Sequence, residues 1–326
     1  AAPHRITSMA ETLDGDITVI TPLANYPTGK IFSGQFRKVF FREYINGVTI
    51  IRYCMMPSNS NSVTLRILSM IITSLAAFFT TFRHLLFNHN YDKVIIQTPP
   101  LTSAFAYALA ARIFSLRIIL NVSDIWPSTA TDLGAMRKGS ISWKVLRFIE
   151  LHLYRNSSSY IAQSEETLGY LNGIHNKPLL LYRNLTKVIN TSFIKKKGNT
   201  KIIYAGLLGI AQDVLKIISQ VDFETLGVEL HIYGYGNQKD EISKLKKSGV
   251  FYHKPVSKEE IQSLMISFDF SLVPLRTYIF GAFPSKINAA VASTIPVLFL
   301  GKGEGVKIVN KFGIGKAFDF EDKIAI

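Results

Sequence analysis

KIIYAGLLG, residues 201–209, joins a hydrophobic run to a loop that contains two glycines. The run at 201–205 has the composition of a buried strand, and residues 213–219 have the apolar spacing of a helix. A glycine-rich turn between a strand and a helix is typical of the first unit of a Rossmann-like domain. The segment therefore predicts that an α/β domain begins near residue 201.

Hydrophobic runs of strand length alternate with helix-length segments on both sides of this unit, as in parallel βαβ units. The predicted strands lie at 17–20, 48–53, 94–97, 117–121 and 159–162 before it, and at 229–233, 270–272, 297–299 and 315–318 after it. The predicted helices lie at 2–13, 65–86, 103–114, 142–154, 213–219, 238–247, 258–267 and 285–293. Two successive Rossmann-like domains are the simplest explanation.

The polar stretch at 190–200, which holds three lysines and a glycine, predicts the linker between the domains. We therefore expect an N-terminal domain at 1–190 and a C-terminal domain at 191–326. The chain opens on a helix-like segment and closes after a strand-like one. An α/β domain normally begins with a strand, so we expect its first strand before Ala1 and a closing helix after Ile326.

The chain carries a net charge of +14, and the first 190 residues hold 19 Lys and Arg against 10 Asp and Glu. Such an excess attracts phosphates on a lipid, a nucleotide or a nucleic acid, and charge does not choose among them. No Lys or Arg run alternates with aromatic residues as base-stacking sites require, so we predict no nucleic-acid partner. The sequence leaves the oligomeric state open.

The longest uncharged apolar stretch, 67–82, lies between Arg66 and Arg83. It is shorter than the ~20 residues that span a bilayer, so we do not predict a transmembrane helix. Two interpretations remain, a helix buried in the domain core and a helix that dips into a membrane surface.

The residues that bind metals or act as nucleophiles are sparse. Cys54 is the only cysteine, so there is no disulfide framework, and its place after a strand-like run favours a buried structural thiol over a nucleophile. The seven histidines form no i, i+4 pair. We predict no metal site and no cofactor.

Three glycine loops follow strands of the second domain: Gly206 with Gly209, Gly234 with Gly236, and Gly301 with Gly303. Each fits either a tight turn or a backbone approach to phosphate, and three at strand ends of one domain favour a crevice for a phosphorylated ligand. The second loop begins like a dinucleotide fingerprint, but Lys239 occupies the place of the third glycine. That substitution disfavours a nicotinamide dehydrogenase.

Lys286 follows Pro284 and Ser285, which can open a helix. A cation in the first turn of a helix opposes the helix dipole, and a bound anion would resolve the conflict. Arg276 follows the preceding strand and can contact the same anion, for example a diphosphate. The alternative for Lys286 is a surface lysine.

In the first domain, Asp124 lies just after a predicted strand, where it can orient a sugar hydroxyl or cap the next segment. Tyr26 and Lys30 lie in a turn-rich loop that is either a plain loop or part of a substrate site. His4 can reach a cleft or lie on the solvated surface.

The order and spacing of these motifs resemble glycosyltransferase family 4, and most of all its bacterial polysaccharide branch that contains L-fucosamine transferases. The resemblance covers nearly the whole chain. It rests on 2–5, 25–30, 97–100, 124–127, Ala205-Gly206 with Gly209 and Gln212, 284–287, and Gly303-Glu304.

The resemblance implies the GT-B architecture, with two Rossmann-like domains facing across a cleft. It also implies retaining, metal-independent transfer from a nucleoside diphosphate sugar, UDP-linked and carrying an N-acetylated amino sugar, to an acceptor on the N-terminal domain. The expected catalytic residues are Asp124 and Lys286, and the acceptor-side residues are His4, Tyr26 and Lys30. The expected donor site comprises Gly206, Leu207, Gly209, Gln212, Gly234, Arg276, Pro284, Ser285, Lys286, Gly303 and Glu304.

The partners implied are a nucleotide sugar, a lipid-linked saccharide acceptor of surface polysaccharide synthesis, and an anionic membrane surface. The place implied is the cytoplasmic face of the bacterial plasma membrane, with peripheral attachment.

The chain departs from the family pattern at two expected glutamates, which read Gly281 and Ala289, and at a turn glycine that reads Thr294. Leu207 also replaces an asparagine that is frequent in this branch. The missing ribose carboxylate at position 289 removes a charge-assisted hydrogen bond of roughly 1.5–3 kcal/mol. Two alternatives therefore stay open, a non-catalytic sugar-nucleotide-binding relative and a sugar-nucleotide epimerase.

Overall fold

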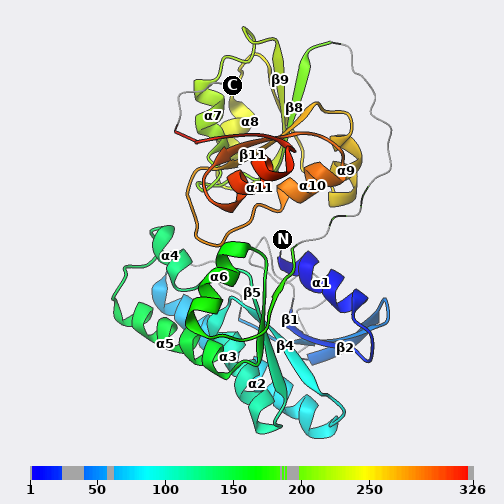
Figure 1. Cartoon of the computed structure of the whole chain (residues 1–326), viewed down its shortest axis with the longest axis vertical. Coiled ribbons are helices and arrows are strands. Elements are labelled where there is room, and N and C mark those ends of the chain that lie inside the picture. Colours follow the sequence, from blue (N-terminus) through cyan, green and yellow to red (C-terminus); the bar gives the residue numbers. More distant parts are fainter. Residues whose placement is uncertain are drawn as a thin grey trace. The chain divides into compact units, whose positions relative to one another are not determined.

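The computed structural model describes residues 2–23, 40–56, 62–183, 186, 188 and 198–321. The chain divides into two compact units, Ala1–Arg183 and Asn184–Ile326 (Figure 1). The predicted boundary between residues 190 and 191 lies outside the described residues and stays a prediction.

Unit 2 is built on one six-stranded parallel sheet, ordered β10-β9-β8-β11-β12-β13. Since the chain starts at β8 in the middle and reverses direction between β8 and β11, this is the doubly wound Rossmann order, and the prediction is confirmed. The strands are β8 (Thr200–Leu207), β9 (Val228–Tyr235), β10 (Val250–His253), β11 (Phe270–Leu275), β12 (Val297–Gly301) and β13 (Gly315–Phe318).

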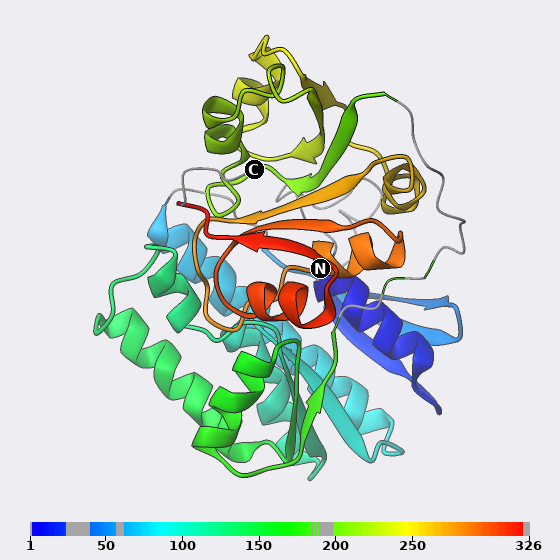
Figure 2. The same ribbon diagram turned by 45° about the horizontal axis from the view of Figure 1, so that its top comes forward.

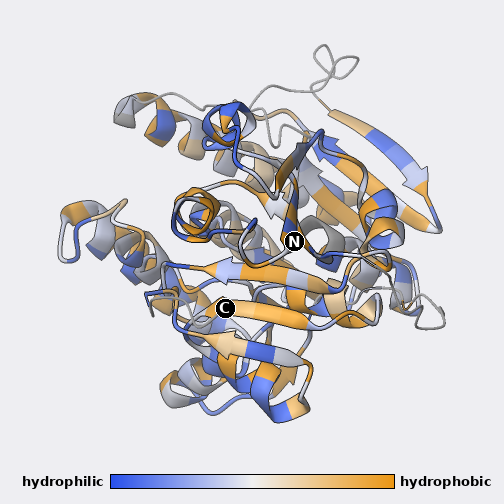
Figure 3. Cartoon of the chain, turned by 90° about the horizontal axis from the view of Figure 1, so that it is seen from above, coloured by the Kyte–Doolittle hydropathy of each residue, from blue (hydrophilic) through white to orange (hydrophobic). Residues whose placement is uncertain are grey.

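Helices pack on both faces of this sheet, and hydrophobic residues colour much of its strands (Figures 2 and 3). The side chains of β8 alternate between two cores: Ile202 and Tyr204 face one, and Ile203 faces the other. The helices are α7 (Val214–Gln220), α8 (Lys239–Lys244), α9 (Lys258–Met265), α10 (Lys286–Ala292) and α11 (Glu304–Phe312).

The strands of unit 1 form two sheets, ordered β1-β3-β2 and β4-β5-β6-β7. Within the described residues, β1 and β4 each pair on one side only, with β3 and β5. The strands are β1 (Thr18–Pro22), β2 (Phe40–Ile45), β3 (Val48–Tyr53), β4 (Lys93–Thr98), β5 (Arg117–Val122), β6 (Ser159–Ala162) and β7 (Leu179–Leu181).

The antiparallel strand β2 departs from the predicted parallel pattern. Its hairpin with β3 turns at Asn46-Gly47, and both residues have positive φ, 50° and 82°. An Asn-Gly pair between two β-branched or aromatic runs is the preferred two-residue hairpin turn. The sequence therefore contained the signal for β2.

The helices of unit 1 are α1 (Ala2–Thr12), α2 (Val63–Phe87), α3 (Leu101–Ile113), α4 (Ser128–Asp132), α5 (Ile141–Asn156) and α6 (Glu165–Ile174). The small residues Ala104, Ala108 and Ala111 let α3 lie close to strands β4 and β5 in the core. Leu146 and Leu153 bring the inner side of α5 into the same core.

Two statements about burial are decided by the structure. Of the two interpretations of residues 67–82, the core helix is excluded, because only 11% of the most apolar part of α2 is buried and its inner stripe consists of Ala77, Thr81 and Leu85. This helix is long and apolar enough to cross a membrane by length and composition. Cys54 is exposed rather than buried, because it lies one residue beyond the end of β3.

Thr294, where the family pattern has glycine, lies in the left-handed region at φ 56°. A β-branched residue there costs roughly 1–2 kcal/mol. We therefore expect Thr294→Gly to raise the free energy of unfolding by about 1 kcal/mol, less the entropy that glycine adds to the unfolded chain. Urea titration measures the change. Thr277→Gly, at a position without positive φ, serves as the control and should destabilise; a destabilised Thr294→Gly would contradict the argument.

Candidate functional site

The carboxyl edge of the unit 2 sheet gathers the predicted donor residues at the point where the strand order reverses. Gly206 at the end of β8 lies opposite Gly234 on β9, and Leu275 at the end of β11 lies opposite Gly301 on β12. The three glycine loops therefore lie at one edge, as predicted. In open α/β sheets ligands bind at this edge, outside the switch point.

Lys286, the first residue of α10, lies directly over Gly206. Gly206 has φ 149°, and a Cβ there would be 2.9 Å from the Lys286 Nζ and closer still to its Cε. The lysine side chain therefore occupies space that any other residue at 206 would fill. This contact joins two segments 80 residues apart, and the φ of 149° favours glycine at the end of β8.

The Lys286 side chain is half-buried. Its Nζ lies 5.3 Å from the centre of the Tyr204 ring, which is itself buried in the sheet. Burial lowers the pKa of Lys286 from 10.5 to about 8. Among the described residues no carboxylate forms an ion pair with it, so an anionic ligand would find a cation whose charge is not neutralised.

The loop after β8 folds back on itself. The backbone N–H groups of Gln212 and Asp213 donate to the Gly209 carbonyl at 3.1 and 2.9 Å. The Gln212 Oε1 is buried and has no hydrogen-bond partner among the described residues. Gly209 and Gln212 thus form one short turn that presents an amide group to this edge.

Arg276 lies at the end of β11, and its N–H donates to the Ala211 carbonyl of the same loop at 2.8 Å. Its side chain forms ion pairs with Asp213 and, at 3.4 Å, with Glu321. The sequence did not predict these pairs. Since two carboxylates already neutralise Arg276, Lys286 is the better candidate for a diphosphate contact.

The remaining predicted donor residues surround this edge. Leu207 is exposed, and Pro284 and Ser285 precede α10, where the Ser285 hydroxyl makes no cap hydrogen bond. Gly303, at φ 82°, precedes the buried Glu304 of α11. Ala289, the expected glutamate position, lies three residues after Lys286 on α10 and packs partly against the core.

In unit 1 a polar cluster lies where β4, β5 and β6 end. Its centre is Arg5 of α1, which is 1% exposed and donates from Nη2 to the Ser123 Oγ at 2.5 Å and to the Gln97 Oε1 at 3.5 Å. Gln97 donates to the same Ser123 Oγ at 2.7 Å, and Gln163 donates to the Ser123 carbonyl at 2.6 Å. The cluster fixes the segment that carries Asp124.

Arg5 and Asp124 change each other's ionisation. Burial lowers the pKa of Arg5 to about 10, and Asp124 opposes that shift. Burial raises the pKa of Asp124, and Arg5 opposes it in turn. The Arg5 Nε and Nη1 are buried without a hydrogen-bond partner in the described part of the chain, so two charged donors remain open beside the carboxylate.

The sequence pointed to Asp124 and did not assign a role to Arg5, Gln97 or Ser123. Polar residues at the carboxyl ends of predicted strands would have indicated Gln97 and Ser123. Arg5 carried no such signal, because it reaches the cluster from a helix.

The structure does not describe the side chains of the other predicted acceptor-side residues, His4, Tyr26 and Lys30. His4 lies in α1 beside Arg5, but its side chain is outside the described residues, as are Tyr26 and Lys30 entirely. No three His, Cys, Asp or Glu residues lie together as metal ligands within the described ranges. Metal independence stays a prediction.

Arg5→Met should raise the pKa of Asp124 further, because it removes the cation that opposes desolvation. A raised carboxyl pKa means that the folded state holds the proton more tightly, so stability falls as pH rises from the unfolded value through the folded one. The variant should therefore lose more stability between pH 4 and 7 than the parent does. Carbon NMR of Asp124 and urea titrations at both pH values measure this. Arg5→Lys, which keeps the charge, is the control; an unchanged Asp124 titration in Arg5→Met would contradict the coupling.

No protein-family model and no curated protein matches the chain. Among solved structures it is similar to TarM, with a TM-score of 0.55 and 16% identity over 76% of this chain. It is also similar to WaaG, a glycosyltransferase involved in lipopolysaccharide biosynthesis, with a TM-score of 0.59 and 12% identity over 97% of this chain. The similarity to Anabaena HepE in complex with UDP and glucose has a TM-score of 0.56 and 14% identity over 84% of this chain.

The chain spans 49% of the TarM chain, 81% of WaaG and 73% of HepE. At these identities the likeness concerns the fold. This chain has the fold of the GT-B glycosyltransferases, with one Rossmann-like α/β unit following another.

Proposed function

We propose that this chain is a glycosyltransferase that takes a sugar from a nucleoside diphosphate sugar, UDP-linked, and transfers it to a saccharide acceptor. Unit 2 binds the donor, and unit 1 contributes the acceptor side. The GT-B fold supports the reaction class, and one of the structures it resembles, HepE, holds UDP and glucose.

The observation that carries the proposal is the Lys286–Gly206 contact at the switch point of unit 2. A partly desolvated ammonium group interacts more strongly with an anion than a solvated one does. Negative charge grows on the diphosphate as the bond to the sugar breaks, so a cation fixed there stabilises the transition state more than the ground state.

On unit 1 we assign Asp124 to the acceptor or sugar hydroxyl, with Arg5 as its positioning residue. The ionised carboxylate is the stronger acceptor for a hydroxyl, and Arg5 opposes the burial that would protonate it. The hydrogen bond from Gln97 to Ser123 holds this part of the chain in place.

The mechanism, the donor sugar and the acceptor that we propose follow from the resemblance to family 4. Transfer proceeds with retention and without a metal, the donor carries an N-acetylated amino sugar, and the acceptor is a lipid-linked or polysaccharide intermediate of bacterial surface polysaccharide synthesis. The motifs around Gly206, Lys286 and Gly303 support this assignment.

The test of donor binding is calorimetry with UDP and the full chain. Lys286→Met should weaken UDP binding about 10- to 100-fold, since a hydrogen bond to a charged group contributes roughly 1.5–3 kcal/mol. Transfer from UDP-sugars to a lipid-linked acceptor should be lost in the same variant.

UDP binding should also depend on pH. With a pKa of about 8, Lys286 is largely neutral at pH 9 in the free chain, and a bound diphosphate raises that pKa. The parent should therefore take up a proton on binding, and its affinity should fall between pH 8 and 10.

The matched control is Lys286→Arg, which stays charged over this pH range and should bind UDP without proton uptake. The assay uses two buffers of different ionisation enthalpy. Equal affinity of the parent and Lys286→Met for UDP would show that Lys286 does not contact the donor.

A second candidate is a non-catalytic sugar-nucleotide-binding relative, and Ala289 favours it. Because position 289 is one helical turn from Lys286, a glutamate there reaches the same ligand. Ala289→Glu should strengthen UDP binding about tenfold or more through a charge-assisted hydrogen bond to the ribose.

Ala289→Gln, which lacks the charge, should give a smaller gain. The non-catalytic candidate is supported if the parent binds UDP in the micromolar range and transfers no sugar, and if Ala289→Glu restores transfer. Transfer by the parent would exclude it.

A further inference from the structure

The outer side of α2 is an exposed hydrophobic stripe. Leu68, Leu75, Phe79 and Leu86 recur at spacings that place them on one face of the helix, opposite the inner stripe of Ala77, Thr81 and Leu85. Between residues 65 and 72 nearly every large apolar side chain is exposed. The hydrophobic face of a helix normally packs inward, so this one requires another partner.

The stripe continues onto two neighbouring helices of the same layer. Helix α3 packs between α2 and α5. Its Ala106 belongs to the same core cluster as Ala77 of α2, and its Phe105 ring makes an edge contact with His152 of α5. The outer side of α3 exposes Leu109 and Ile113. The outer side of α5 exposes Ile141, Val145 and Phe148 at helical spacing, and Leu151 lies beside them. We call the outer sides of α2, α3 and α5 the apolar face.

Cations, and almost no anions, accompany this face. The three helices carry six Lys and Arg residues and a single carboxylate, Glu150, which is buried and paired with Arg147. The exposed cations are Arg66, Arg83, Arg112, Lys144 and Arg155. Long basic side chains beside apolar ones place their alkyl stems on hydrophobic surface and their charges at its border.

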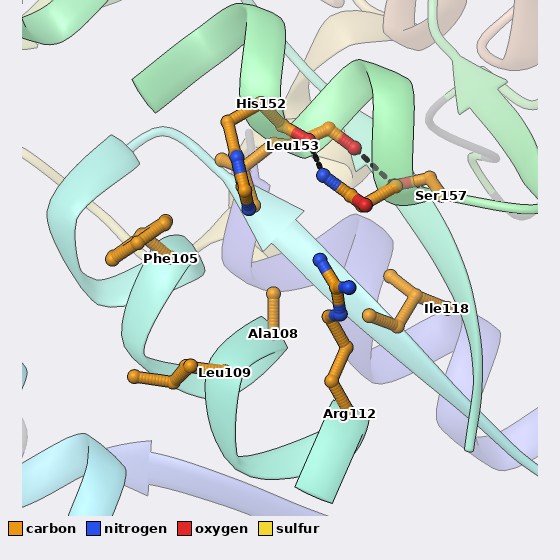
Figure 4. A pocket seen from close by; sticks show the side chains of 9 residues that line it. Phe105, Ala108, Leu109, Arg112, Ile118, His152, Leu153 and Ser157 are labelled. Carbon is orange, nitrogen blue, oxygen red and sulfur yellow. Dashed lines mark hydrogen bonds between the residues drawn. The ribbon is translucent and has the colours of Figure 1, made fainter. Parts of the chain in front are cut away.

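A small pocket lies between α3 and α5 (Figure 4). Phe105, Ala108, Leu109, Ile118 and Leu153 line it with carbon, and the Arg112 guanidinium points into it from α3. His152, Asn156 and Ser157 complete the lining, so the pocket combines an apolar wall with polar groups and one guanidinium.

We propose that the apolar face is a docking surface for an anionic phospholipid bilayer. The outer residues of α2, α3 and α5 enter the boundary between headgroups and acyl chains, and Arg112, Lys144 and Arg155 contact lipid phosphates. Charge complementarity selects this occupant, since three helices that expose five cations and no carboxylate attract anionic lipid and repel a second copy of the same face.

Helix α2 lies on this surface rather than across the bilayer. It connects β3 and β4, and both strands belong to unit 1. If the helix spanned a membrane, the two strands would be on opposite sides of it. The neighbouring helices α3 and α5 contribute to the same face and contain shorter apolar stretches, which suits attachment to one leaflet.

The experiment is cosedimentation of the full chain with vesicles of phosphatidylcholine, with or without phosphatidylglycerol. We expect binding to anionic vesicles that weakens at high salt, and weaker binding to phosphatidylcholine alone. Phe79→Glu on α2 and Phe148→Glu on α5 should each lower the partition coefficient about tenfold or more, since burying one such side chain contributes roughly 1.5–3 kcal/mol.

Phe312→Glu on α11 of unit 2 is the matched control, because Phe312 is 63% exposed and Phe79 and Phe148 are 62% and 67% exposed. This variant should bind vesicles as the parent does. Arg112→Gln with Lys144→Gln should reduce the preference for anionic lipid and leave binding to phosphatidylcholine unchanged. All these positions are exposed, and circular dichroism checks that each variant is folded.

The inference goes beyond the proposed function, and the two can fail separately. UDP calorimetry on Phe79→Glu and Phe148→Glu should match the parent even where vesicle binding is lost. The inference is overturned if the parent does not bind anionic vesicles, or if Phe312→Glu loses as much vesicle binding as Phe79→Glu. It is also overturned if sedimentation without lipid shows a dimer that Phe79→Glu dissociates.

Discussion

The parallel pairing of β8 with β9 and β11 is the constraint on which unit 2 depends. It aligns Gly206 with Gly234, and the pairing of β11 with β12 sets their ends side by side, so that three loops meet at one edge. The Lys286 side chain then occupies the space that a side chain at 206 would fill. Because this contact places a half-buried cation at the switch point, it is where the proposed donor diphosphate would bind.

Unit 1 uses the same kind of edge for a different electrostatic arrangement. Its centre is a buried guanidinium, held by Ser123 and Gln97, beside a carboxylate whose pKa burial raises. Lys286 has no carboxylate partner in the described part of unit 2, whereas Arg5 and Asp124 partly compensate each other. A donor diphosphate suits the first arrangement and a neutral hydroxyl suits the second, which matches the proposed division of labour between the units.

The departures from the family pattern differ in their consequences. Thr294 occupies a left-handed position that glycine would adopt without strain, so that change costs stability and leaves the chain path intact. Ala289 lies where the family 4 pattern has a carboxylate, one helical turn from Lys286, and under the proposed function it would weaken donor binding. Arg276 forms ion pairs with Asp213 and Glu321, and its contact with a diphosphate stays a prediction. The outer sides of α2, α3 and α5 are independent of all three, because they lie on the helical layer of unit 1.

The sequence by itself determined the alternation of strands and helices, the Rossmann-like class of the second unit and the places of its glycine loops, because these depend on local periodicity and on glycines in short turns. The Asn46-Gly47 pair, typical of a two-residue hairpin turn, also indicated the β2–β3 hairpin, although the pattern of alternating strands and helices did not include β2. Only the tertiary structure decided that Lys286 lies on Gly206, that Arg5 reaches Ser123 from another element, and that α2 leaves its apolar side uncovered. Each of these depends on which segments pack together, and periodicity tells which side of a helix is apolar without telling what covers it.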